Sequence, residues 1–355
     1  MKIKIHSSEL NRMLKTVVQC IDTKIQTKNS NINIIHDNNL LAIRATNGTF
    51  SAVMTAPLMG GTGESFYVDG AMFAKVCAMC SGEIEISTDE KTCTVKGAGR
   101  TRIPIVNTDL PNFERVTGST AIIEATKFTN CYNHVAYAIA QDQSRIQLTG
   151  VLTEITDNVV KMVALDGFQM SIEEADCEGD DMKAIIPGFF MKLVSSATFP
   201  GDKIKLTTDG HFIQVETDGA LLKCGCLAGE YVDYSRILPT EFAIRCKANV
   251  SSLRDALKAG SVINNKQALV KLEVSSDAIT IKNNSEQADY EANVPCETQG
   301  NGLRIAFNEK YLMNTINAID TDDAELNFNS GVTPVVVKSM NGKGIRLVLP
   351  VRVQG

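Results

Sequence analysis

The chain contains no tryptophan and few aromatic residues, which make up only 6% of its 355 positions. Its hydrophobic cores must therefore be built from Ile, Val, Leu, Met and Ala. No apolar run approaches the roughly 20 residues of a membrane-spanning helix, so we expect no membrane partner. The opening residues 1–6 are typical of a short strand rather than a secretory signal, and we expect a cytoplasmic protein.

A basic excess is also missing, since 35 Lys and Arg residues stand against 41 Asp and Glu residues and the net charge is −6. This balance argues against tight, charge-driven binding of nucleic acid, for which a basic surface is the usual mark. Apolar residues at 44% and charged residues at 21% are typical of a globular protein. The length favours two or three domains.

Patterns that would indicate catalysis or metal binding are scarce. Ten cysteines are scattered, mostly in apolar runs, and we expect reduced thiols. Cys77 and Cys80 have the spacing of redox and zinc sites, but no second Cys or His pair lies at a suitable distance. The acidic run at 178–181 lacks the spacing of a calcium loop. We therefore expect no catalytic residue, no metal and no cofactor.

What the sequence does contain is an internal repeat with a period of about 120 residues, present in three copies. Each copy opens with an amphipathic helix that has Ser7, Thr126 or Asn249 at its start, where a side-chain oxygen can cap free N–H groups. Alternating strands then follow, interrupted by turn residues. The strands lie at 32–34 and 40–54, at 147–152 and 159–172, and at 270–274 and 278–282; the turns lie at 37–39, 157–158 and 276–277.

A second helix appears in every copy and leads into a further strand. The helices lie at 71–77, 189–194 and 310–316, and the strands at 83–87, 203–207 and 324–328. The pattern predicts an α+β fold of three tandem domains, each with two helices on antiparallel sheets, over 1–120, 121–243 and 244–355. Sheets joined edge to edge between copies would hide their strand edges. Three such units form an arc, which closes into a ring if its ends are complementary.

Three segments carry a resemblance to a known family: 163–170 (VALDGFQM), 231–239 (YVDYSRILP) and 347–353 (LVLPVRV). With these segments and the repeat, the whole chain resembles the bacterial DNA polymerase III beta subunit, the DNA sliding clamp. The resemblance implies the DNA clamp fold, with each chain forming half of a ring. Two chains would close head to tail as a homodimer around double-stranded DNA, without sequence specificity. The protein would be a non-catalytic processivity factor of DNA replication, with DNA polymerase, the clamp loader and other proteins that carry short clamp-binding peptides as partners.

The resemblance also implies a peptide-binding cleft between the second and third domains. Where this chain has Leu165, Phe168 and Gln169 the family usually has Thr, His and Arg, and it has Pro in place of Val232, so the cleft should be more apolar and less cationic. Arg236 and Arg352 would hydrogen-bond peptide carbonyls at the rim. The cleft residues would be Leu148, Leu165, Gly167, Phe168, Gln169, Met170, Val232, Arg236, Ile237, Leu347, Leu349, Pro350, Val351 and Arg352.

A ring would reconcile the acidic composition with DNA binding, because encirclement prevents dissociation and weak phosphate contacts permit sliding. Basic residues recur on the expected inner helices and on the loop after the first helix. The expected DNA-binding residues are Arg12, Lys15, Lys24, Lys28, Lys75, Lys192, Arg254, Lys258 and Lys310, and the expected dimer-interface residues are Arg102, Ile103, Val262 and Ile263.

Two other hypotheses remain open at this point. One is a thiol- or metal-dependent enzyme that uses Cys77 and Cys80. The other is a structural repeat protein without a role at DNA. The absence of an acid/base or nucleophile constellation weighs against the enzyme, and the clamp-like cleft residues weigh against the structural protein.

Overall fold

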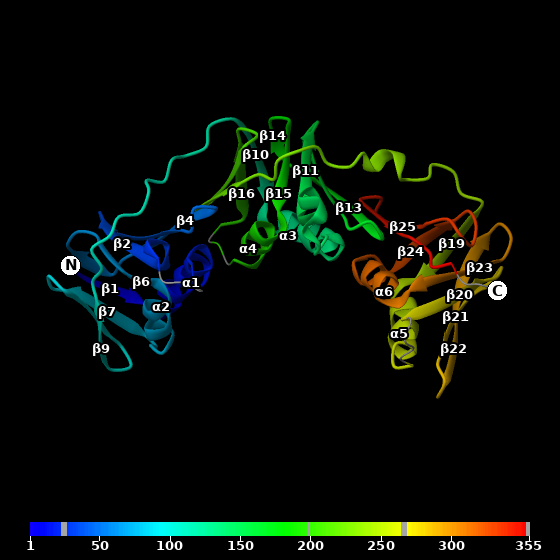
Figure 1. Ribbon diagram of the computed structural model, residues 1–355, viewed down its shortest axis with the longest axis horizontal. Helices are drawn as coiled ribbons and strands as arrows, with labels where there is room; N and C mark the ends of the chain where they lie inside the picture. Colours follow the sequence, from blue (N-terminus) through cyan, green and yellow to red (C-terminus); the bar gives the residue numbers. More distant parts are fainter. Residues whose placement is uncertain (23–26, 198, 200, 264–267, 353–355) are drawn as a thin grey trace. The chain divides into compact units, whose positions relative to one another are not determined.

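The computed structural model describes residues 1–22, 27–197, 199, 201–263 and 268–352. Contacts divide the chain into two compact units, formed by 1–126 with 177–227 and by 127–176 with 228–355. Each unit combines helices with antiparallel sheets, as Figure 1 shows with its labels. The predicted α+β fold class is therefore confirmed.

The first unit contains two sheets and the helices α1 (Ser7–Val17), α2 (Gly70–Ala78) and α4 (Gly188–Ser196), with short 3-10 turns at Val18–Cys20 and Lys28–Ser30. One sheet has the order β5 (Gly60–Thr62), β1 (Lys2–His6), β7 (Glu83–Thr88), β8 (Thr92–Lys96), β9 (Arg100–Pro104). The other has the order β14 (Glu178–Gly179), β10 (Ser119–Glu124), β16 (Lys203–Thr208), β17 (Phe212–Thr217), β18 (Ala220–Gly225), β4 (Phe50–Pro57), β3 (Leu40–Thr46), β2 (Asn31–Asp37), β6 (Phe66–Asp69). Strand β15 (Met182–Pro187) leads into α4.

The second unit contains α3 (Ala125–Val135), α5 (Val250–Gly260) and α6 (Glu309–Asn317), with 3-10 turns at Ala136–Ala138, Gln143–Thr149 and Tyr234–Arg236. Its strands follow one another in a continuous order. The order is β11 (Gly150–Thr156), β12 (Val159–Leu165), β13 (Gln169–Asp176), β26 (Gly344–Val348), β25 (Val335–Ser339), β24 (Asp323–Phe328), β19 (Ile244–Asn249), β22 (Asp289–Gln299), β21 (Ala278–Asn284), β20 (Leu269–Val274), β23 (Leu303–Asn308).

Local chemistry explains where the helices and hairpins begin. The Asn249 side chain caps α5 by accepting the amide of Ser252 (3.0 Å), as predicted. The prediction was wrong for α1, where the ring of His6 accepts the Ser8 amide and Ser7 already lies in the helix. The predicted turns are confirmed: Asn38–Asn39 and Asp157–Asn158 have positive φ, the conformation that two-residue hairpin turns require and that Asn and Asp tolerate.

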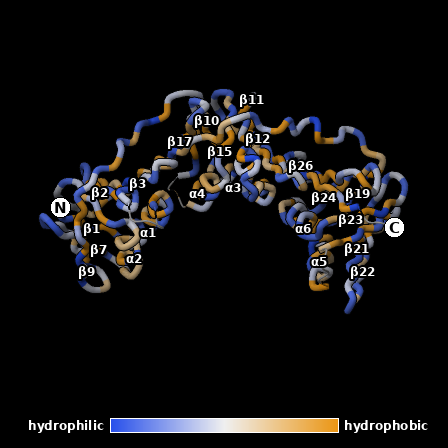
Figure 2. Tube along the Cα trace, in the orientation of Figure 1, coloured by the Kyte–Doolittle hydropathy of each residue, from blue (hydrophilic) through white to orange (hydrophobic). Residues whose placement is uncertain are grey.

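The hydrophobic cores lie between the helices and the sheets. Hydrophobic and hydrophilic residues are interspersed along the chain (Figure 2), and in β1 the residues Ile3 and Ile5 are buried while their neighbours are exposed. Helix α1 packs on α2 and β4, and α5 packs on α6 and β22. The apolar stripes of the helices thus cover one face of each sheet.

Two strand pairings join sequence-distant segments and are called the first and second seams below. In the first seam, β4 pairs with β18 from Phe50 opposite Cys224 to Met54 opposite Ala220. In the second, β13 pairs with β26 from Gln169 opposite Val348 to Glu173 opposite Gly344. Each seam uses the first five residues of β4 or β13, so the register repeats. The seams join strands of neighbouring predicted domains, whose boundaries stay a prediction.

Candidate functional site

The second seam brings together the most specific segments of the sequence. Met170 on β13 lies opposite Leu347 on β26 and, on its other side, opposite Leu165 on β12. All three side chains are at most 5% exposed, and the predicted cleft residue Leu148, on the 3-10 turn Gln143–Thr149, is 4% exposed. Leu165, Met170 and Leu347 thus form a closed apolar floor rather than an open cavity.

The turn between β12 and β13 is held by the Asp166 carboxylate, which accepts the amides of Phe168 (2.8 Å) and Gln169 (2.9 Å). Gly167 takes a φ of 93°, which favours glycine. The amide of Leu349 then donates to the Phe168 carbonyl (2.9 Å). Asp166 and Gly167 therefore shape the edge of the site, and the chain end after β26 is attached to this turn.

The exposed apolar side chains among the predicted cleft residues are called the rim below. Phe168 is 56% exposed, Ile237 39%, Leu349 36% and Val351 40%. The Val351 amide donates to the Ala306 carbonyl (2.8 Å), which ties the chain end to β23. Exposed apolar side chains next to a buried apolar floor are what a short peptide with large apolar anchors can cover.

An aromatic pair that sequence analysis missed stands on this rim. The rings of Phe168 and Tyr311 are stacked, with centroids 5.6 Å apart and planes 16° from parallel. The one available signal was that Tyr311 is an aromatic residue on an amphipathic helix in a chain with few aromatics.

The segment that carries Val232 and Arg236 is anchored on β11 and β12. The Tyr231 hydroxyl donates to the Val163 carbonyl (3.4 Å) and the Tyr234 hydroxyl donates to the Glu154 carboxylate (2.8 Å). Burial raises the pKa of both tyrosines, which therefore stay protonated donors. Arg236 is 86% exposed and paired with Asp233 (2.8 Å), so its guanidinium lies in solvent, where a peptide carbonyl could reach it.

Gln169 points away from the exposed rim. Its side chain is 4% exposed and donates to the Tyr137 carbonyl (3.2 Å) and to Asp166 (2.8 Å). It therefore supports the turn from the helix side of the sheet. Pro350 is half-buried and Arg352 is exposed at the end of the described chain.

The predicted DNA-binding residues fall into two groups. Arg12 is 14% exposed and paired with Glu9 (2.9 Å), and Arg254 donates to the carbonyls of Ile316 and Ile319 at the end of α6, so both have structural partners. Lys24 lies outside the described residues. The exposed residues on helices or beside them are Lys15, Lys28, Lys75, Lys192, Lys258 and Lys310.

The predicted interface residues also differ in exposure. Arg102 is exposed on β9, whereas Ile103 is 3% exposed and belongs to the core. Val262, just after α5, is 78% exposed, and Ile263 is half-buried.

The C-x-x-C pair has no active-site character in the structure. Cys77 is fully buried in α2, and burial raises the pKa of its thiol, with the nearby Cys80 and Cys93 adding to the effect. A thiol held protonated in this way is a poor nucleophile. Within the described residues, no group of three or more His, Cys, Asp or Glu side chains is placed to hold a metal ion.

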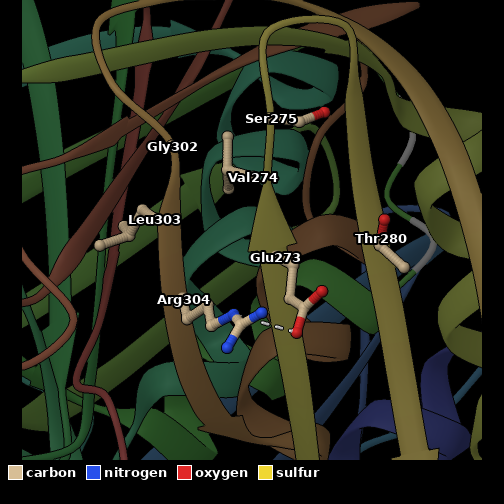
Figure 3. Close-up of a pocket in the computed structure, with 7 residues that line it drawn as sticks. All are labelled: Glu273, Val274, Ser275, Thr280, Gly302, Leu303 and Arg304. Carbon is tan, nitrogen blue, oxygen red and sulfur yellow. Dashed lines mark ion pairs between the residues drawn. The ribbon is translucent and has the colours of Figure 1, made fainter.

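A pocket of about 360 Å³ on the β20–β21–β23 sheet offers no alternative site (Figure 3). The carboxylate of Glu273 is bound by Arg304 (3.2 Å) and Lys282 (3.0 Å), and these cations lower its pKa. Thr280, on the same wall, donates to Asn293 (2.7 Å). The polar side chains that line the pocket thus already have partners. Among them there is no acid/base pair whose pKa values are shifted apart.

The described helices include none that is long and apolar enough to cross a membrane.

Comparisons with known proteins agree with this geometry. The family models for the central and C-terminal domains of the DNA polymerase III beta subunit match residues 122–233 and 235–352. A beta sliding clamp of Pseudomonas putida is 26% identical over 280 residues, 76% of each chain, and one of Staphylococcus epidermidis is 23% identical over 302 residues, 81% of this chain and 80% of that one. The crystal structure of the Thermotoga maritima DNA polymerase III beta subunit matches with a TM-score of 0.92 at 21% identity, covering 99% of this chain and all of that one. The chain therefore belongs to the DNA polymerase III beta subunit family of beta sliding clamps, which are non-catalytic processivity factors of DNA replication.

Proposed function

We propose that this clamp works as a head-to-tail homodimeric ring of six domains around double-stranded DNA, with a peptide-docking cleft at each second seam. Three tandem domains over 1–120, 121–243 and 244–355 are supported by the family models, which match the central and C-terminal thirds. The polymerase, the clamp loader and other clamp-binding proteins would use the same cleft. A cytoplasmic location stays a prediction.

The observation that carries the cleft is the contrast between its floor and its rim. Leu165, Met170 and Leu347 are buried, whereas Phe168 and Leu349 beside them are 56% and 36% exposed. A peptide with adjacent Leu and Phe side chains can cover this rim and remove apolar surface from water. Because the floor is closed in the free protein, binding needs small side-chain movements at the rim.

The cleft can be tested with a peptide that has a Gln-x-x-Leu-Phe core. Leu349→Asp places a charge on the exposed rim and should weaken binding about tenfold or more. Met170→Lys should abolish it. Ser51→Lys, at the position of the first seam that corresponds to Met170, is the matched control and should leave affinity unchanged. Equal peptide affinity of the wild-type protein and the three variants, measured by fluorescence anisotropy, would refute this site.

A third seam between two chains is our proposal for the dimer. In the described part of the chain, β9 pairs with β8 alone, and residues 289–294 of β22 pair on one side only, with β21. By their place in the repeat, β22 corresponds to β4 and β13, and β9 corresponds to β18 and β26. The register of the two observed seams, carried over, sets Arg102 opposite Asp289 and Arg100 opposite Glu291 of the partner chain.

This register is favourable because opposite charges directly across a strand pair attract. The neighbouring surface also suits an interface, since Met79 on the α2 side is 77% exposed and Val262 is 78% exposed. Met79 and Val262 lie on segments after helices, and the segments at the same positions of the other repeats lie close to the first and second seams. Among the four predicted interface residues, Arg102 and Val262 are the accessible ones.

Charge reversal tests the third seam. The variant Arg100→Glu/Arg102→Glu should shift the mass measured by light scattering from about twice the 38.5 kDa chain mass towards the monomer. Adding Asp289→Arg and Glu291→Arg should restore the dimer. Arg304→Glu, on the other edge strand β23, is the control. Dimers of unchanged stability in the first variant would contradict the proposed register.

Encirclement itself is tested on DNA. The loaded protein should be retained on closed circular DNA and lost when the circle is cut, because weak phosphate contacts alone do not resist dissociation. Replacing the exposed Lys15, Lys75, Lys192, Lys258 and Lys310 by Ala should reduce loading, with the largest effect at low salt, where phosphate contacts are least screened. Equal rates of dissociation from circular and linear DNA would contradict the ring model.

A further inference from the structure

We infer that Arg346 and Glu173 are positioning residues for the cleft: their buried ion pair fixes β26 against β13 in the register that sets Leu347 opposite Met170. The inference rests on the proposed peptide cleft and adds residues that do not touch the peptide. Its observations come from the helix-facing side of the second seam.

Arg346 is fully buried, and Glu173 is 5% exposed. The Nη2 of Arg346 donates to the Glu173 carboxylate and to the Ala318 carbonyl at the end of α6 (2.8 Å), and Nη1 donates to the Ser339 hydroxyl (3.2 Å). On the other side, Nδ1 of His134 lies 3.4 Å from the same carboxylate. One guanidinium thus links β13, β25, β26 and the end of α6.

Side-chain alternation places this network on the reverse of the cleft floor. Gln169, Ser171 and Glu173 all face the end of α3, since Gln169 donates to the Tyr137 carbonyl and Ser171 to the His134 carbonyl (2.7 Å). Arg346 lies directly opposite Ser171 and faces the same way. Met170 and Leu347, one residue along each strand, therefore point to the opposite face.

Gly344 shows that the seam is shaped around this guanidinium. It lies opposite Glu173, and a Cβ added to it would sit 1.6 Å from Nη1 of Arg346 and 2.8 Å from Oε2 of Glu173. Neither distance is tolerable, and the guanidinium is enclosed. The glycine is therefore needed for space, and not for an unusual backbone conformation.

A buried ion pair is a stricter register device than apolar packing. A slip of one residue would turn Arg346 to the other face and leave the buried Glu173 carboxylate without its guanidinium, which is strongly unfavourable. Apolar side chains can repack after such a shift at smaller cost. The pair thus excludes alternative pairings of β26 with β13.

The test compares stability with peptide affinity. Arg346→Met should destabilise the chain because it removes the guanidinium that neutralises the buried Glu173 carboxylate, whereas the double variant Glu173→Met/Arg346→Met should fold with near-wild-type thermal stability. We expect the double variant to bind the Gln-x-x-Leu-Phe peptide with an affinity at least about tenfold lower than that of the wild-type protein. Lys343→Met removes an exposed pair with Asp176 (3.3 Å) at the same end of the seam and is the control. Wild-type affinity in a folded double variant would overturn the inference.

Amide hydrogen exchange gives a readout that does not depend on the peptide. The amides of residues 345–349 should exchange faster in the double variant and in Gly344→Ala, while those of the β19–β24 pair stay protected. If the wild-type protein bound no peptide but the exchange effect appeared, the proposed cleft would fail and the register role would stand. Unchanged exchange across the seam in both variants would reject the register role itself.

Discussion

The two seams have the same backbone and opposite chemistry. On the face away from the helices, the second seam presents Leu165, Met170 and Leu347, whereas the corresponding positions of the first seam hold a threonine, a serine and a lysine. These are Thr46, Ser51 and Lys223, and the lysine donates to the Glu114 carbonyl (3.1 Å) and lies over the Phe212 ring. Only the second seam can offer an apolar surface to a peptide.

On the helix-facing side the contrast is reversed. The first seam packs Ala52, Met54 and Leu222, all fully buried, where the second seam packs Ser171, Glu173 and Arg346. The first seam is therefore apolar on its helix-facing side and polar on its outer face. The second seam is polar on its helix-facing side and apolar on its outer face. The backbone repeat sets where a cleft can form, and the side chains decide which seam carries one.

Exchanging the outer faces should give the largest effect. The variant Leu165→Thr/Met170→Ser/Leu347→Lys copies the first seam onto the second and should lower peptide affinity about 100-fold or more, since the apolar floor is lost. Binding is measured by calorimetry, and circular dichroism checks that the chain is folded. Retained affinity would show that the rim alone, with Phe168 and Tyr311, binds the peptide.

Removing apolar packing from the first seam should give an intermediate effect. Leu222→Ala deletes a fully buried side chain and should lower the free energy of unfolding by about 2–5 kcal/mol in urea denaturation. Leu221→Ala, at the half-buried neighbouring position, should cost less. Similar losses for both substitutions would contradict the assignment of Leu222 to the helix-facing side.

Alkaline pH should lower the stability of the unit that contains the first seam. Burial raises the pKa of the Cys20 and Cys224 thiols from 9.0 to about 12, and the charge of Cys224 contributes to the shift at Cys20. Between these values the unfolded thiols lose protons while the folded ones keep them, so the free energy of unfolding falls as pH rises. Cys224→Ala should make this decline shallower between pH 9 and 12. An unchanged slope would mean that other groups dominate.

The sequence by itself determined the repeated units, because helix stripes, strand alternation and turn residues are local signals. Asn249 could be recognised as a cap and Asp157–Asn158 as a turn without any tertiary information. The floor residues Leu165, Met170 and Leu347 could also be named, since the resemblance fixed their positions in matching segments.

Only the tertiary structure decided which distant groups meet. Glu173 and Arg346 are far apart in sequence, and their ion pair exists because β26 is laid against β13. The Phe168–Tyr311 stack and the inward direction of Gln169 depend on the same pairing. A strand pattern specifies that a segment has two faces, but its pairing partner and register are set by long-range packing and by buried charges that tolerate a single arrangement.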